Sequence, residues 1–293
     1  MSSEFVQLAN LPLIVGPTVL GGMFSYGLFG MLIVQLFFYQ FDTRDQDPTW
    51  LRVFVSVLAL SELVNMIVTT IFMWEVLAQH WGDPFILLSV DSLASKTLAG
   101  IPLLSGIVAT MAHSFFSWRI HRLTGSSLIP TIVMLEKISL TTCAMAGYCG
   151  IRAAHIGIFR LTELDVEVTI WLGGSTLCDL IISAVLVFKL LYQQKRAMSF
   201  QTRHQIHHLI ALTVETSLVT TLTALFALAL FILLHNDDMF FAPLLMLSQV
   251  YSNCLLATLN SRTVLNKVAS SGHPLWVDLD RSRTTTSLLH TYE

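Results

Sequence analysis

Seven apolar stretches occupy most of this 293-residue chain, and each is long enough to cross a bilayer. A helix needs roughly 20 apolar residues to span about 30 Å of hydrocarbon, whereas a barrel strand has about 10 alternating ones. Lipid offers no water to unpaired backbone groups, so a spanning segment must be a helix or part of a closed barrel. The lengths of these runs predict helices near residues 18–40, 51–75, 95–118, 128–152, 168–192, 209–234 and 239–261.

Composition leaves no room for a separate soluble domain. Hydrophobic residues make up 54% of the chain and charged residues only 12%, against about 25% charged residues in an average soluble domain. We therefore predict an all-α, polytopic membrane protein with one seven-helix domain over residues 18–262. Residues 1–17 form an extracellular N-terminus and residues 263–293 a disordered cytoplasmic tail in this prediction. The net charge of −3 is too small to suggest a nucleic-acid partner, and the bilayer is the partner that the composition requires.

Lysine and arginine residues predict the orientation, because they accumulate on the cytoplasmic side of a membrane. Alternate connecting segments carry twelve basic residues on one side and three on the other. This asymmetry predicts an outside N-terminus and a cytoplasmic C-terminus. The three basic residues on the predicted outer side are Lys96, Arg152 and Arg160.

Small residues recur along the first span, at Gly21, Gly22, Ser25, Gly27 and Gly30. In lipid, helices associate through close backbone approach at small residues rather than through hydrophobic burial. We therefore expect this set to form a helix-packing surface rather than a binding site.

Ionisable residues inside the spans are the best pointers to function, because a charge in mid-bilayer is costly. Two readings compete for them. In the first, Lys137 pairs with Glu215 or Asp179 and the polar groups only fix the register of the helices. In the second, an unpaired Asp179 or Glu62 exchanges protons or binds a cation along a transport pathway. Neighbouring positions point about 100° apart on a helix, so at most one of Glu136 and Lys137 faces the bundle centre. The candidate intramembrane polar site is Glu62, Asn65, Lys137, Asp179, Glu215 and Asn253.

Diagnostic motifs of well-known seven-helix classes are missing. The third span ends Ser114-Phe-Phe-Ser-Trp-Arg-Ile-His-Arg-Leu-Thr124 without an acidic-Arg-aromatic triplet, and the last span has neither Asn-Pro-x-x-Tyr nor a lysine that could hold retinal. The chain also lacks the H-E-x-x-H pattern that binds zinc on a helix. We predict no catalytic residue, no metal and no cofactor.

Several segments resemble the seven-span fungal membrane proteins grouped under domain of unknown function 6534. The resemblance implies the seven-helix fold and supplies no established activity. Such proteins often carry an acidic residue ahead of a Thr-His pair in the second helix, whereas here Glu62 is followed by Leu63-Val-Asn65. The segments that carry the resemblance are Gly30 to Tyr39, Asp47 to Leu51, Ser114 to Leu123, the Asp179-bearing fifth span, Arg203 to Leu212 leading to Thr216-Ser-Leu218, and Tyr251 to Arg262.

These observations predict a receptor-like or sensory protein without catalytic activity, which responds to an unknown small ligand or a cytoplasmic signalling partner. A proton- or cation-coupled transporter is the alternative, and a membrane-embedded lipid hydrolase the third reading. A signalling partner would dock on the basic cytoplasmic surface, although the same charges also serve to hold the loops inside. This candidate docking surface consists of Arg119, Arg122, Lys195, Arg196 and Arg203.

Overall fold

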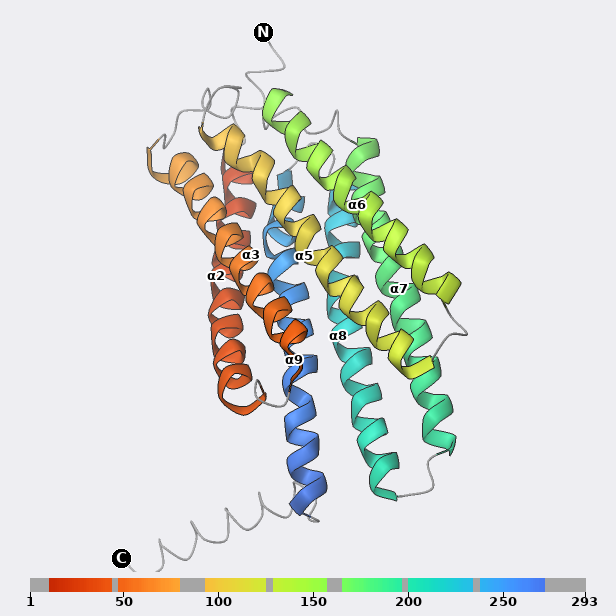
Figure 1. The fold of residues 1–293 in the computed structure, drawn as a ribbon. Coiled ribbons are helices and arrows are strands. Elements are labelled where there is room, and N and C mark those ends of the chain that lie inside the picture. The colour runs from red at the N-terminus through yellow and green to blue at the C-terminus, as the bar shows by residue number, and fades with distance from the viewer. Residues whose placement is uncertain are drawn as a thin grey trace, which may run out of the picture.

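The protein is a bundle of long helices that run alternately up and down (Figure 1). A computed structural model describes residues 11–43, 47–79, 93–124, 129–156, 165–196, 200–233 and 238–271. These residues contain seven α-helices and no strand. The helices are α2 (Leu11–Phe38), α3 (Thr49–Trp74), α5 (Leu93–Thr124), α6 (Ile129–Ile156), α7 (Asp165–Arg196), α8 (Phe200–Leu233) and α9 (Phe241–Ser271).

Six of these helices are long and apolar enough to cross a membrane. The exception is α6, which was predicted as the fourth span and carries Glu136 and Lys137 in its first half. It has 28 residues, which at about 1.5 Å per residue exceed the thickness of the hydrocarbon core. It packs along α5 and α7 and so belongs to the same bundle.

The helices extend beyond several of the predicted limits. Helix α2 begins at Leu11, inside the segment 1–17 that was predicted as an extracellular N-terminus. Helix α9 continues to Ser271, so the predicted tail boundary at 263 falls inside a helix. Apolar length marks only the part of a helix that lipid surrounds, whereas the helix itself continues into more polar sequence at either end.

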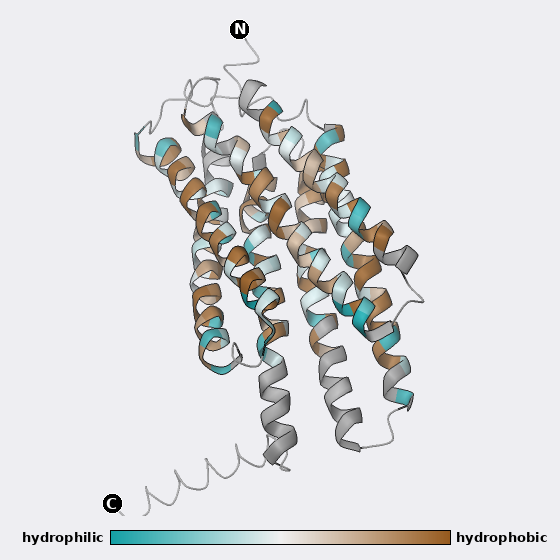
Figure 2. Ribbon diagram, viewed as in Figure 1, coloured by the Kyte–Doolittle hydropathy of each residue, from teal (hydrophilic) through white to brown (hydrophobic). Residues whose placement is uncertain are grey.

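The last helix, α9, occupies the middle of the bundle. Of the residues in its apolar stretch 83% are buried, against 22% in α2. Helix α9 packs against α2, α8, α5 and α3. The outer helices carry hydrophobic residues along most of their length, with hydrophilic residues more frequent towards their ends (Figure 2). This arrangement explains why α9 can carry many polar residues that never meet lipid.

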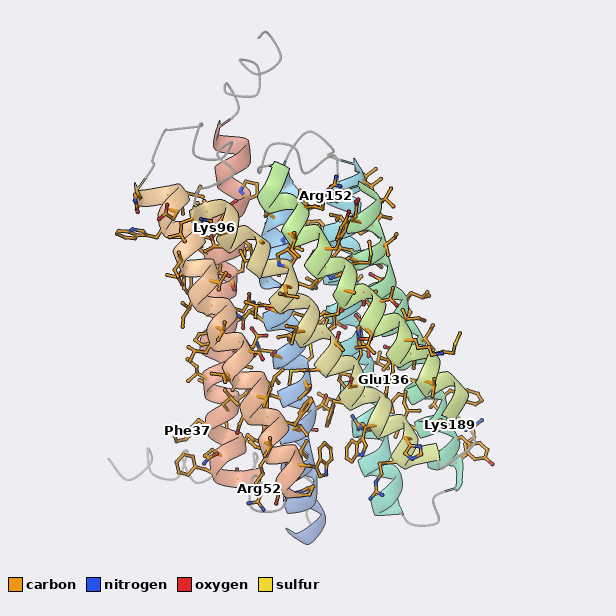
Figure 3. All side chains as sticks on the ribbon, turned by 45° about the horizontal axis from the view of Figure 1, so that its top comes forward. Phe37, Arg52, Lys96, Glu136, Arg152 and Lys189 are labelled. Carbon is orange, nitrogen blue, oxygen red and sulfur yellow. The ribbon has the colours of Figure 1, made fainter. Side chains whose placement is uncertain are left out.

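Basic residues lie at the two ends of the bundle, as expected for helices that run alternately up and down. Arg52 and Lys189 lie towards one end, and Lys96 and Arg152 towards the other (Figure 3). Each pair belongs to one predicted side of the membrane. The structure contains no membrane, so the orientation itself stays a prediction.

Close helix contact involves only part of the predicted small-residue surface on α2. A Cβ atom added at Gly21 would lie 2.8 Å from the backbone of Ala242 in α9, and one at Gly22 would meet the side chain of Met73. Ser25 is buried as well. By contrast, a Cβ atom at Gly27 or Gly30 would have no neighbour within 4 Å. The close approach of α2 to α9 therefore depends on the first part of this set.

This contact predicts that Gly21→Ala destabilises the protein, because the added methyl group would overlap the backbone of α9. Overpacking of this kind typically costs about 1–3 kcal/mol. Gly27→Ala is the matched control on the same helix and should leave stability unchanged or raise it. Thermal unfolding of the two purified variants in detergent checks the prediction, which fails if both variants unfold like the wild type.

Candidate functional site

Glu62 projects from α3 into the contact with α9 and has no exposed surface. Ser252 Oγ donates a hydrogen bond to Glu62 Oε1 at 2.5 Å, and Ser248 Oγ donates to Oε2 at 3.3 Å. These two serines lie one helical turn apart on α9, so both hydroxyl groups reach the same carboxyl group. Asn65, one turn further along α3, donates from Nδ2 to Ser248 Oγ at 2.6 Å. Hydrogen bonds from neutral groups thus tie α3 to α9.

Asp179 of α7 forms the centre of a second buried network. Tyr251 of α9 donates its hydroxyl hydrogen to Asp179 Oδ2 at 2.7 Å. His113 Nε2 of α5 lies 3.1 Å from Oδ1 of the same carboxyl group. The other ring nitrogen of His113, Nδ1, lies 3.0 Å from Ser139 Oγ of α6. One carboxyl group therefore connects α7 with α9 and, through a single imidazole ring, with α5 and α6.

Residues next to the two networks retain hydrogen-bonding capacity. Asn253 donates from Nδ2 to the backbone oxygens of Leu28 and Gln249, which fastens α9 to α2. The side-chain oxygens of Asn65 and Asn253, and both polar atoms of Gln249, are buried without a hydrogen-bond partner among the described residues. A buried polar group without a partner is costly. The middle of the bundle can therefore accept further hydrogen bonds without losing those it has.

The remaining predicted site residues lie away from the bundle centre. Glu136 is half-buried and accepts a hydrogen bond from Ser114 Oγ at 3.0 Å. The next residue, Lys137, is exposed, as expected from the turn of about 100° per residue. Glu215 is also exposed on α8. Neither Lys137 nor Glu215 forms an ion pair with a described residue, so the predicted pairing of Lys137 with Glu215 or Asp179 is absent from this part of the chain.

The candidate docking surface is described only in part. Arg122 of α5 and Lys195 of α7 are exposed, whereas Arg119 is half-buried. The side chains of Arg196 and Arg203 lie outside the described residues. Helices α5 and α7 are in contact with each other, so the exposed cations belong to neighbouring elements.

Sequence reasoning did not assign the partners of the two carboxyl groups. The residues His113, Ser139, Ser248, Ser252 and Tyr251 were not assigned to a site. The signal available was the density of polar residues in the last span, where Ser248, Gln249, Ser252 and Asn253 repeat at helical spacing. A helix so polar must lie inside the bundle, where its hydroxyl groups can find acceptors.

The chemistry open to this arrangement is hydrogen bonding and proton exchange. Among the described residues no three His, Cys, Asp or Glu side chains come together as metal ligands. Ser139, His113 and Asp179 are the residue types of a nucleophile–base–acid triad. Ser139, however, has no exposed surface, and a nucleophile must be reachable by its substrate.

The fold and the composition of its helices define a helical multi-pass membrane protein, with six helices long and apolar enough to span the bilayer. Residues 175–264 match the model of a family of unknown function, DUF6534. The predicted resemblance is thereby confirmed. No curated protein and no solved structure matches the chain. The match includes Asp179 and Tyr251, while Glu62 and His113 lie outside it.

The Asp179 network predicts measurable coupling between α7 and α9. Tyr251→Phe and Asp179→Asn should each destabilise the protein, and the double variant should lose less than their sum because the first change removes and the second weakens the same hydrogen bond. Interhelical hydrogen bonds in membranes have coupling energies of about 0.6 kcal/mol on average and up to about 1.7 kcal/mol. Reversible unfolding in mixed micelles measures this coupling energy.

The matched control replaces Tyr148, which is exposed on α6, by phenylalanine in combination with Asp179→Asn. Tyr148 contacts Arg152 rather than Asp179, so the effects of the two changes should add. Coupling as large for Tyr148 as for Tyr251 would contradict the assignment of the hydrogen bond.

Proposed function

We propose that this protein is a receptor-like or sensory membrane protein without catalytic activity, in which helix α9 is the element that moves. The observation that carries the proposal is the way in which α9 is fastened. Two carboxyl groups on different helices, Glu62 and Asp179, accept hydrogen bonds from the hydroxyl groups of Ser252 and Tyr251, which are adjacent residues of α9.

Such contacts suit a switch between two arrangements of the helices. Hydrogen bonds between membrane helices are individually weak, at about 0.6 kcal/mol on average, so a small ligand has enough binding energy to exchange one set for another. A ligand shifts the equilibrium only by its difference in affinity between the two arrangements. The unpartnered polar atoms of Gln249 and Asn253 on α9, and of Asn65 on α3, are available for new hydrogen bonds when α9 shifts.

A pair of aromatic rings links this movement to the predicted cytoplasmic end. Trp50 at the start of α3 and Trp118 near the end of α5 have ring centroids 4.7 Å apart. Glu62 lies on the same helix as Trp50, and His113 on the same helix as Trp118. A rearrangement at either carboxyl group would alter the spacing of the two rings and would reposition Arg122 for a signalling partner.

Proton-coupled transport is the second candidate, and one observation favours it. Glu62 is fully buried and forms no ion pair with a described residue. An uncompensated charge in a membrane interior is costly, so such a carboxyl group is stable when it holds a proton or a cation. Transport would require the same group to release its proton alternately to the two sides.

Proton flux distinguishes the two candidates. Proteoliposomes with the purified wild type, under an imposed membrane potential, should show no more proton flux than protein-free liposomes, because both carboxyl groups hold helices together rather than line a path. The variants Asp179→Asn and Glu62→Gln should behave in the same way. Flux in the wild type that either variant abolishes would replace the receptor proposal with the transporter.

Tryptophan emission tests the receptor proposal directly. A compound that raises the unfolding temperature of the purified wild type in a small-molecule screen should also change the emission of the Trp50–Trp118 pair. The change should disappear in Trp118→Phe, while stabilisation by the compound persists. Stabilisation without any Trp118-dependent change would show that binding leaves the ends of α3 and α5 in place.

A further inference from the structure

A groove opens between the end of α2 and the start of α3, away from the two buried carboxyl groups. Its volume is about 560 Å³, within the range of small-molecule sites. Phe37 of α2 and Arg52 of α3 lie at this end of the bundle (Figure 3) and both line the groove. Here α2 ends in a π-helical turn, Tyr39–Thr43, a form of helix that is frequent at functional sites.

The mouth of the groove carries an anchored cation. Arg52 Nε donates a hydrogen bond to the backbone oxygen of Asp47 at 2.9 Å, which fixes the plane of the guanidinium group. The two terminal amino groups of Arg52 make no hydrogen bond or ion pair with a described residue. The side chain of Gln40 is exposed on the opposite wall. A planar guanidinium with free donors matches the oxygens of a phosphate or carboxylate group.

Both walls of the groove become mostly apolar along the helix axes away from Arg52 and Gln40, with Ser56 of α3 as the polar exception. Ala59 lies seven positions after Arg52 on α3, and Ile33 lies seven positions before Gln40 on α2. At 1.5 Å per residue each interval is about 10 Å along the helix axis. Apolar residues that line the groove include Ile33, Val55 and Ala59. The groove therefore offers one charged end and one hydrocarbon end.

Aromatic rings form the outer side of the mouth. The rings of Phe37 and Phe41 lie 4.4 Å apart between centroids, and the two residues are 59% and 71% exposed. Exposed rings without a polar group suit contact with acyl chains. They border the path by which a molecule could enter the groove from the membrane.

We propose that this groove binds one anionic membrane lipid. The guanidinium group of Arg52 contacts the phosphate of the headgroup, and an acyl chain lies along Ile33, Val55 and Ala59. Charge complementarity selects an anionic headgroup, and the apolar inner walls select an amphiphile over a free phosphate ion. In the predicted orientation the mouth faces the cytoplasmic leaflet, where anionic lipids are concentrated. The proposal does not depend on the function proposed above.

Native mass spectrometry of the full-length protein in detergent tests the proposal, with phosphatidylserine and phosphatidylcholine added separately. The wild type should retain one phosphatidylserine molecule in preference to phosphatidylcholine. Arg52→Gln should weaken that binding about fivefold, which corresponds to about 1 kcal/mol for one basic residue at a membrane surface. Arg122→Gln is the matched control, since it removes an exposed cation outside the groove and should leave binding unchanged.

A second pair of variants tests the apolar end. Ala59→Trp fills the groove without changing charge and should reduce lipid retention, whereas Val57→Trp places the same side chain on an exposed part of α3 and should not. Size-exclusion profiles identify any variant that fails to fold. Three results would each overturn the proposal. The first is an equal loss of phosphatidylserine binding in Arg52→Gln and Arg122→Gln, and the second is equal retention of the two lipids. The third is that inorganic phosphate stabilises the protein as much as phosphatidylserine does.

Discussion

The absence of water from the bilayer interior is the constraint on which the structure depends. Every polar group that enters the hydrocarbon region must find a partner in the protein itself. Helix α9 carries a dense set of hydroxyl and amide groups, and the bundle keeps them away from lipid by surrounding this helix with α2, α3, α5 and α8. Glu62 and Asp179 supply the acceptors. The arrangement of the outer helices is thus a response to the polarity of the central one.

Sequence alone predicted the helices well because length and apolar character report on the bilayer directly. It also identified Glu62, Asn65, Asp179 and Asn253 as inward-facing candidates, since their burial follows from the cost of exposing them to lipid. The partners could not be predicted. Which hydroxyl group meets which carboxyl group depends on how the helices are rotated against one another, and one sequence contains no measure of that rotation.

The error over Lys137 has a different origin. A lysine at that depth was expected to need a carboxylate from another helix, yet it lies on the exposed side of α6 next to the half-buried Glu136. A long lysine side chain can extend its ammonium group along a helix towards the interface. The length of a lysine side chain therefore allows Lys137 to lie on an exposed helix face, whereas the carboxyl groups of Glu62 and Asp179 are buried between helices. The small residues of α2 could not be told apart from sequence either. Only the structure shows that Gly21 lies close to α9 and that Gly27 does not.

The central position of α9 has a consequence for biosynthesis. It is the last of the seven helices among the described residues, and synthesis proceeds from the N-terminus. Helices α3 and α7 therefore enter the membrane before the hydroxyl groups of Ser252 and Tyr251 have been made. Until the ribosome reaches α9, Glu62 lacks both of its serine donors, and Asp179 has only His113 beside it. The contacts of α9 with the other helices can therefore form only at the end of translation, and a chain truncated before α9 would leave Glu62 without its serine donors in the membrane.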